Sequence, residues 1–187
     1  MHSILALCDR IDRTLELIAE TCVWAFIGCI VTICFDVVSR KFGYQIPGLG
    51  STRLQEMEWH FHGVLFCTWL GWAYIKNAHV RIDVFTGQLD ARRQARLELI
   101  GCFLFALPYL FVALPFAHAF FMTSLTQLEG SSAPNGLGWR FLIKGFLYFG
   151  FISVAFAVVS VALRRVVFLY GPPEIARRAL PKPSAGH

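Results

Sequence analysis

Four side chains that could bind a metal ion or transfer protons crowd one short stretch of the chain: Glu56, Glu58, His60 and His62. Carboxylate and imidazole groups are common ligands of zinc. On an α-helix, however, the two i, i+4 pairs within this set point in directions about 160° apart, taking about 100° per residue. Such pairs cannot share one ion. We therefore predict no metal site, no cofactor and no catalytic residue, and we do not expect an enzyme.

The histidines suggest a second chemistry, which is haem ligation. Small four-helix membrane anchors of respiratory complexes bind haem through histidines on different helices. In the topology derived below from the basic residues, His60, His62 and His118 all lie toward the outer side of the membrane. A haem- or quinone-binding membrane anchor is therefore the alternative to the function favoured below. The six cysteines contain no CxxC pair, and this spacing is not typical of zinc or disulfide frameworks.

Four long apolar segments must position these side chains, approximately residues 18–38, 57–76, 97–121 and 141–163. Each is long enough to cross a hydrocarbon core about 30 Å thick. Of the 187 residues only 16% are charged, against about 25% in an average soluble domain. The sequence therefore predicts an all-α integral membrane protein.

The expected architecture is one domain, residues 1–170, with four transmembrane helices in a bundle. Residues 171–187 are expected to form a basic, disordered cytoplasmic tail. Before the first span, Ile4, Leu7 and Ile18 belong to one apolar stripe with charged residues opposite. This pattern predicts an amphipathic lead-in helix at the membrane interface, although a simple helical extension would fit it equally well.

Basic residues indicate how the spans are oriented. Twelve Lys and Arg residues lie at the N-terminus, between the second and third spans, and at the C-terminus, against five in the other two loops. The positive-inside rule then places both termini in the cytoplasm. The cations line the membrane boundaries without forming a continuous basic face, so nucleic acid is not an expected partner.

Local signals predict where two helices begin and bend. The pattern from Thr52 to Gln55 is typical of a capping box, so the second helix is expected to start near Arg53. Pro108 and Pro115 would bend the third span, because proline removes a helical hydrogen bond and crowds the preceding turn.

Charged and aromatic residues at the ends of the first two spans are the candidates for contact with a partner subunit. Asp36 and Arg40 are four residues apart and can pair on one helix face, where we favour a structural role. Arg81 and Asp83 follow the second span, where the chain turns polar. A further stripe projects within about 40° of one direction on the second helix, and helix packing is its favoured role. Its members are Glu58, His62, Trp69, Trp72 and Lys76.

Three runs resemble the small membrane subunit of tripartite ATP-independent periplasmic (TRAP) transporters. They are Glu56-Met-Glu58-Trp59-His60 with the aromatic helix after it, the run 79–85 (HVRIDVF), and the run 131–144. The resemblance covers nearly the whole chain. Two positions depart from the family pattern: Asp36 stands where asparagine is frequent, and Ala78 where glycine is usual.

This resemblance implies an accessory subunit of a secondary active transporter that imports an organic acid. Its partners would be a large polytopic membrane subunit, a periplasmic substrate-binding protein and membrane lipids, in the bacterial inner membrane. The small subunit would brace the large one and could help to dock the binding protein. On this reading Asp36, Arg40, Glu58, Trp69, Trp72, Lys76, Arg81 and Asp83 serve assembly.

Overall fold

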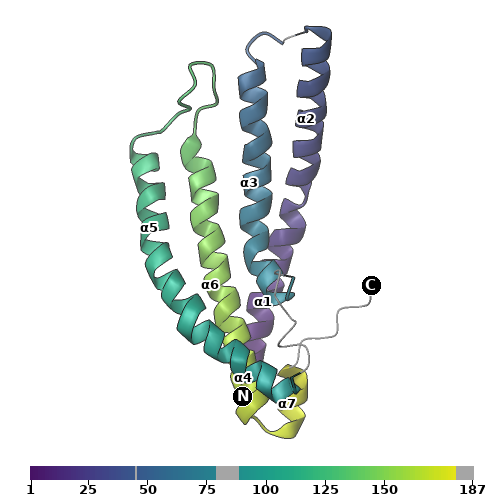
Figure 1. Ribbon diagram of the computed structural model, residues 1–187, viewed down its shortest axis with the longest axis vertical. Coiled ribbons are helices and arrows are strands. Elements are labelled where there is room, and N and C mark those ends of the chain that lie inside the picture. Colours follow the sequence, from purple (N-terminus) through teal and green to yellow (C-terminus); the bar gives the residue numbers. More distant parts are fainter. Residues whose placement is uncertain (45, 79–88, 180–187) are drawn as a thin grey trace.

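The computed structural model describes residues 1–44, 46–78 and 89–179, and over these residues the chain is helical, with no β-strand. This confirms the all-α class. In chain order the elements are α1 (His2–Cys22), α2 (Trp24–Phe42), α3 (Ser51–Ile75), α4 (Ala91–Gly101), the π-helix η1 (Cys102–Ala106), α5 (Leu107–Thr126), α6 (Arg140–Tyr170) and α7 (Pro173–Ala179) (Figure 1).

Three continuous helical stretches are long and apolar enough to cross a membrane: His2–Phe42, Ala91–Thr126 and Arg140–Tyr170. They contain the first, third and fourth apolar segments, and they identify a membrane protein. The second segment lies in α3, which is not among the three because its glutamates, histidines and tryptophans lower its apolar content. A fourth crossing by α3 therefore stays a prediction.

The long helices form an open row instead of the closed four-helix bundle that we expected. α2 packs on α3, α3 on α6, and α6 on α5 (Figure 1). Among the described residues, α2 and α5 share no extensive contact. An open row is stable in a bilayer, because lipid covers apolar helix faces as well as another helix would.

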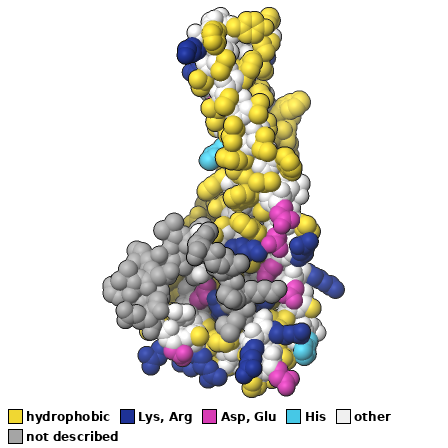
Figure 2. Space-filling view, turned by 90° about the vertical axis from the view of Figure 1, so that its right-hand side faces the viewer, with side chains coloured by type: hydrophobic (Ala, Val, Ile, Leu, Met, Phe, Trp, Pro, Cys, Tyr) yellow, Lys and Arg dark blue, Asp and Glu magenta, His cyan; other side chains and the backbone are white. Residues whose placement is uncertain are grey.

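The row has two chemically different ends. Its upper end in Figure 1 carries the α2–α3 and α5–α6 connections, and its lower end carries the start of α1 together with α4 and α7. Figure 2 shows apolar side chains over much of the upper part and most charged side chains in the lower part. The stretch His2–Phe42 has 41 residues and is about 60 Å long, about twice the hydrocarbon thickness. The charged lower end is the part that must extend beyond the hydrocarbon.

α3 and α6 make the most extensive contact in the row. A Cβ atom added to Gly71 would lie 2.7 Å from the carbonyl oxygen of Ser153, and one added to Gly150 would lie 3.0 Å from that of Cys67. Thr68 and Ser153 are buried at the same level, and their hydroxyl groups donate to carbonyls of their own helices. Small residues thus let the two backbones approach closely, as is typical of helix pairs in membranes.

α1 is helical and leads into α2 through Val23, but it packs on α3 and α6. Its buried residues are Leu5, Cys8, Leu15 and Ala19. Leu7, which we assigned to the apolar stripe, is 51% exposed. Cys8 and Leu15 of the predicted stripe are buried, whereas the carboxylate of Asp12, on the predicted polar side, binds α6, as described below. The location of α1 at the membrane interface stays a prediction.

Part of the expected disordered tail is a helix. α7 (Pro173–Ala179) packs on α6 and buries Ala179 against Leu5 and Val167. This contact also places the start of α1 and the end of α7 at the same end of the row. Residues 180–187 lie outside the described part of the chain.

The third predicted span is bent as its prolines suggested. Pro108 cannot donate a helical hydrogen bond, and the preceding turn widens into η1, in which the N–H of Leu107 donates to the carbonyl of Cys102, five residues back. Pro115 lies inside α5. The capping box was not formed: α3 begins at Ser51, with no side-chain hydrogen bond at its N-cap, Gly50.

The close approach at Gly71 predicts that Gly71→Ala destabilises the fold. The methyl group would contact the α6 backbone, and overpacking of this kind costs about 1–3 kcal/mol. A lower midpoint of thermal unfolding in detergent, relative to the unmodified protein, is the expected result. Gly101→Ala is the matched control, because its added Cβ meets no atom within 4 Å and alanine favours the helix. Equal midpoints for the two variants would contradict the close packing.

Candidate functional site

The guanidinium group of Arg164 ties α1 to α6 at the lower end of the row. Its Nη2 lies 2.6 Å from Asp9 Oδ1 and 2.7 Å from Asp12 Oδ2, and its Nε lies 3.1 Å from Asp12 Oδ2. Ser160 Oγ donates to the other oxygen of Asp12 at 2.6 Å. Both Asp12 oxygens are therefore bonded within the chain. We call Asp9, Asp12, Ser160 and Arg164 the Arg164 cluster.

Two further ion pairs connect helices at the same end. Lys76, which follows α3, binds Glu16 of α1 at 2.7 Å. Arg165 of α6 binds Glu98 of α4. The Lys76–Glu16 pair is partly exposed, and exposed ion pairs contribute less than about 1 kcal/mol each. Arg165 and Glu98 are mostly buried. The main effect of both pairs is to fix which helix faces meet.

The tryptophans of the predicted stripe face α1. Trp69 Nε1 donates to the carbonyl of Ala19 at 3.1 Å, and the rings of Trp69 and Trp72 have centroids 5.6 Å apart. Lys76 Nζ lies 6.0 Å from the Trp72 ring centroid. This agrees with the packing interpretation for the lower half of the stripe. In the upper half, Glu58 is half-buried and His62 is exposed.

Asp36 and Arg40 form the predicted ion pair. The Asp36 side chain is completely buried, and its Oδ2 accepts from Arg40 Nη2. Its Oδ1 accepts from Ser51 Oγ at 3.0 Å. The carboxylate therefore connects α2 to the first residue of α3, which supports the structural role.

Glu56 has a role that the sequence did not reveal. Its carboxylate accepts hydrogen bonds from Ser131 Oγ and from the backbone N–H of Leu137, in the loop between α5 and α6. The side chain is 8% exposed. A Cβ added to Gly136 would lie 2.7 Å from Glu56 Oε2, so the loop requires a glycine at this position. Sequence reasoning considered Glu56 as a metal ligand and as part of a family-like run, but it did not reveal the loop partners, which are 75 and 81 residues away.

These contacts shift the titration of two acids at the upper end. The Ser131 hydroxyl, with help from the Leu137 N–H, lowers the pKa of Glu56 against the opposing effect of burial. A hydrogen bond from Lys144 likewise lowers the pKa of Glu129 in the α5–α6 loop. Both carboxylates are ionised at neutral pH, and both hold the loop to the helix ends.

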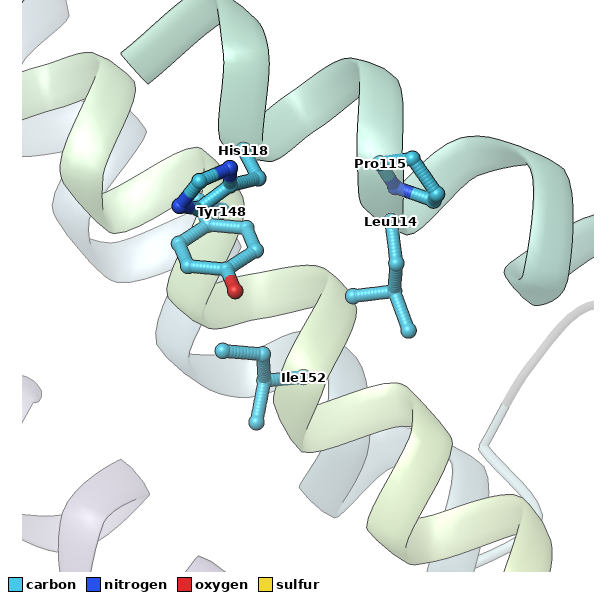
Figure 3. A pocket seen from close by; sticks show the side chains of 5 residues that line it. All are labelled: Leu114, Pro115, His118, Tyr148 and Ile152. Carbon is cyan, nitrogen blue, oxygen red and sulfur yellow. The ribbon is translucent and has the colours of Figure 1, made fainter. Parts of the chain in front are cut away.

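His60 and His118 lie on helices that are not neighbours in the row. His60, on α3, has its ring centroid 3.9 Å from that of Trp59, and its Nδ1 contacts the carbonyl of Glu56. His118, on α5, stacks edge-on against Tyr148 of α6 at 5.3 Å. Figure 3 shows His118 and Tyr148 together in an open groove with Leu114, Pro115 and Ile152. No group of three metal-ligating side chains occurs within residues 1–44, 46–78 and 89–179.

Arg81 and Asp83 fall outside the described residues. The other candidates divide into three classes. Asp36, Arg40, Trp69 and Lys76 have polar partners within the chain, and Trp72 lies beside the Trp69 ring and Lys76. The described contacts give Glu58 no side-chain partner. The large exposed surface is apolar and lies on the two end helices. Val31 of α2 is 61% exposed and Phe111 of α5 is 81% exposed. We take these outward faces as the candidate interaction surface.

Loss of the Arg164 cluster should release α1. In Arg164→Gln, Asp9 and Asp12 lose their charged partner, and we expect the free energy of unfolding to fall by about 1.5–3 kcal/mol, the range for hydrogen bonds to charged groups. Hydrogen exchange in α1 should become faster, while exchange in α5 stays unchanged. Arg178→Gln is the control, because Arg178 is exposed. An unchanged exchange rate in α1 of Arg164→Gln would contradict the conclusion that Arg164 holds α1 against α6.

The Glu56 contact should weaken in acid. Because the folded-state pKa lies below the ordinary value of 4.5, the stabilisation is complete above about pH 4.5 and is lost as pH falls through the folded pKa. Protease cleavage of the loop 127–139 should thus accelerate below pH 4.5. Glu56→Gln should be cleaved faster already at pH 7, with Glu58→Gln as control. Equal cleavage of both variants at pH 7 would contradict the contact.

The outward faces of α2 and α5 are apolar, and the polar contacts lie between helices of the chain. This distribution suits a membrane protein whose outward faces pack against lipid or another membrane protein. No family model, curated protein or solved structure matches the chain. The resemblance to a transporter subunit therefore stays a prediction from the sequence.

Proposed function

We propose that the chain is the small membrane subunit of a TRAP-type secondary transporter that imports an organic acid across the bacterial inner membrane. In this role it braces a large polytopic subunit. All four long helices cross the membrane, and both termini lie in the cytoplasm. The proposal combines the resemblance of the runs around Glu56, His79 and Ser131 with the charge distribution of the loops.

One observation supports the bracing role most strongly: the row is open. Its polar side chains are largely bonded inside the chain, while the outward faces of α2 and α5 are apolar and exposed. Helices in a bilayer associate through van der Waals packing and interhelical hydrogen bonds, because lipid tails already surround their apolar faces and no hydrophobic driving force is left. A rigid, broad apolar face is therefore a suitable surface for a second membrane protein.

The ordered loop at the upper end supports a second contact. Glu56 binds the loop at Ser131 and Leu137, and Arg53 Nε donates to the carbonyl of Asn135 at 3.2 Å. A loop held in one conformation loses little further entropy when a partner binds. In the proposed topology this loop faces the periplasm, where it could help to dock the substrate-binding protein.

The haem-anchor alternative gains no support from the positions of the described histidines. His60 lies on α3 and His118 on α5, and α6 lies between these helices in the row. A haem iron held by two histidines needs them on facing surfaces. The TRAP-type scaffold is therefore the function that we carry forward.

Co-purification from the native membrane in mild detergent tests this function. We expect one large polytopic membrane protein to co-elute with the tagged chain in stoichiometric amount, and the complex to lack a haem absorption band. Co-elution of a flavin or iron–sulfur protein, or a haem spectrum, would overturn the proposal and favour the respiratory anchor.

Photo-crosslinking then identifies which outward face the partner covers. A crosslinking amino acid replaces Val31 on α2 in one variant and Phe111 on α5 in another, since both are strongly exposed. At least one should crosslink to the large subunit with high yield. The control position is Arg177 on α7, which is exposed outside the row. Crosslinks to lipid only at both apolar positions would contradict bracing through these faces.

A further inference from the structure

The arginines at the lower end of the row divide into two groups. Arg164 and Arg165 are bonded to acids of neighbouring helices. Arg92, Arg93 and Arg96 of α4 are exposed, and none of them has an ion-pair or hydrogen-bond partner among the described residues. A charged side chain that is not used inside the fold is available to a ligand of opposite charge.

These three arginines share one side of α4. Taking about 100° per residue, Arg92, Arg93 and Arg96 lie within about 100° of one another. The acid of the same helix, Glu98, points to the other side, where it binds Arg165 of α6. Ala95 is buried on that side too. The outer side of α4 is therefore strongly positive, and the ion pair with α6 fixes its orientation.

Large apolar side chains continue this same side toward the hydrocarbon. Leu97 is 48% exposed and Ile100 is 54% exposed. By the same helical geometry both lie within about 100° of Arg96, the middle of the three arginines, whereas Glu98 lies about 160° from it. In η1, Phe103 and Leu104 are 58% and 61% exposed. We call the side formed by Arg92, Arg93, Arg96, Leu97, Ile100, Phe103 and Leu104 the α4 face. It has a cationic zone of about one and a half turns, followed directly by an apolar zone.

This order matches the structure of a phospholipid. Its anionic headgroup lies at the membrane surface, and its acyl chains run inward along the helix. α4 belongs to the membrane-crossing stretch Ala91–Thr126, so the change from arginine to apolar residues marks the boundary between headgroups and hydrocarbon. A soluble phosphate compound would use the cationic zone alone, whereas a phospholipid uses both zones.

The geometry points to the α4 face as a binding site for an anionic phospholipid, with the headgroup phosphate on Arg92, Arg93 and Arg96 and an acyl chain along Ile100, Phe103 and Leu104. Arginine suits this ligand because its planar guanidinium group can donate two hydrogen bonds to a phosphate. The inference is independent of the transporter proposal, because it needs only a membrane and the described part of α4 and η1.

Native mass spectrometry of the full chain in detergent tests this inference. Phosphatidylglycerol and phosphatidylcholine with identical acyl chains are added, and the retained lipid is measured. Each arginine near an anionic surface contributes about 1 kcal/mol. The triple variant Arg92→Gln, Arg93→Gln, Arg96→Gln should therefore lose about tenfold to a hundredfold of its preference for phosphatidylglycerol.

Three controls make the result specific. The triple Arg→Lys variant keeps the charge and should retain most of the preference. Arg177→Gln with Arg178→Gln removes two exposed arginines from α7, whose described residues carry no exposed large apolar side chain beside them, and should leave the preference for phosphatidylglycerol within about twofold. Ile100→Asn should weaken retention of both lipids alike. Circular dichroism verifies that each variant is folded.

Several outcomes would overturn the inference. One is equal retention of the two lipids by the unmodified chain. Another is an equal loss of preference in the α7 variant, which would indicate a general charge effect. Soluble glycerol phosphate binding as tightly as phosphatidylglycerol would show that the apolar zone has no role. A crosslink from Ile100 to a protein partner in native membranes would assign the α4 face to that protein.

Discussion

The arrangement depends on the close contact between α3 and α6. Gly71 and Gly150 have no side chains at the positions where the two backbones meet, so the helices approach within contact of each other's carbonyls. α2 then packs on the free side of α3, α5 packs on the free side of α6, and α1 crosses both at the lower end (Figure 1). Every other helix is thus positioned by the central pair. A bulkier residue at either glycine would displace α2 and α3 relative to α5 and α6.

Lipid surroundings explain how the charged residues are used. A buried charge is costly unless it is paired and hydrogen-bonded, and accordingly the buried Asp36 is bonded to both Arg40 and Ser51. At the lower end Arg164 and Arg165 bind acids of α1 and α4, and at the upper end Glu56 binds the α5–α6 loop. These bonds select one arrangement of helices that lipid alone would not specify. The side chains that take no part in these bonds form the exposed apolar surface and the α4 face.

Much of this fold follows from local patterns, and much of the site does not. Apolar segment length predicts the helices, the spacing of Asp36 and Arg40 predicts their pair, and Pro108 predicts a distorted turn. The sequence missed the contacts of Asp12 with Arg164 and of Glu56 with Ser131, because their partners are 152 and 75 residues away. For the same reason the sequence did not show that Asp12, on the predicted polar side of α1, binds α6. The open row was also unpredictable, because lipid and protein neighbours favour the same apolar residues.

The central claim, that four helices brace a partner inside the membrane, requires α3 to cross the bilayer. Cysteine labelling in intact and permeabilised cells measures this directly in a cysteine-free variant. Single cysteines are placed at His2, Gly48, Asn135 and Arg177, and a membrane-impermeant maleimide is added. Four crossings predict that positions 48 and 135 react in intact cells, while positions 2 and 177 react only after permeabilisation. Reaction of positions 2 and 177 from opposite sides of the membrane would mean an odd number of crossings, and would contradict the account.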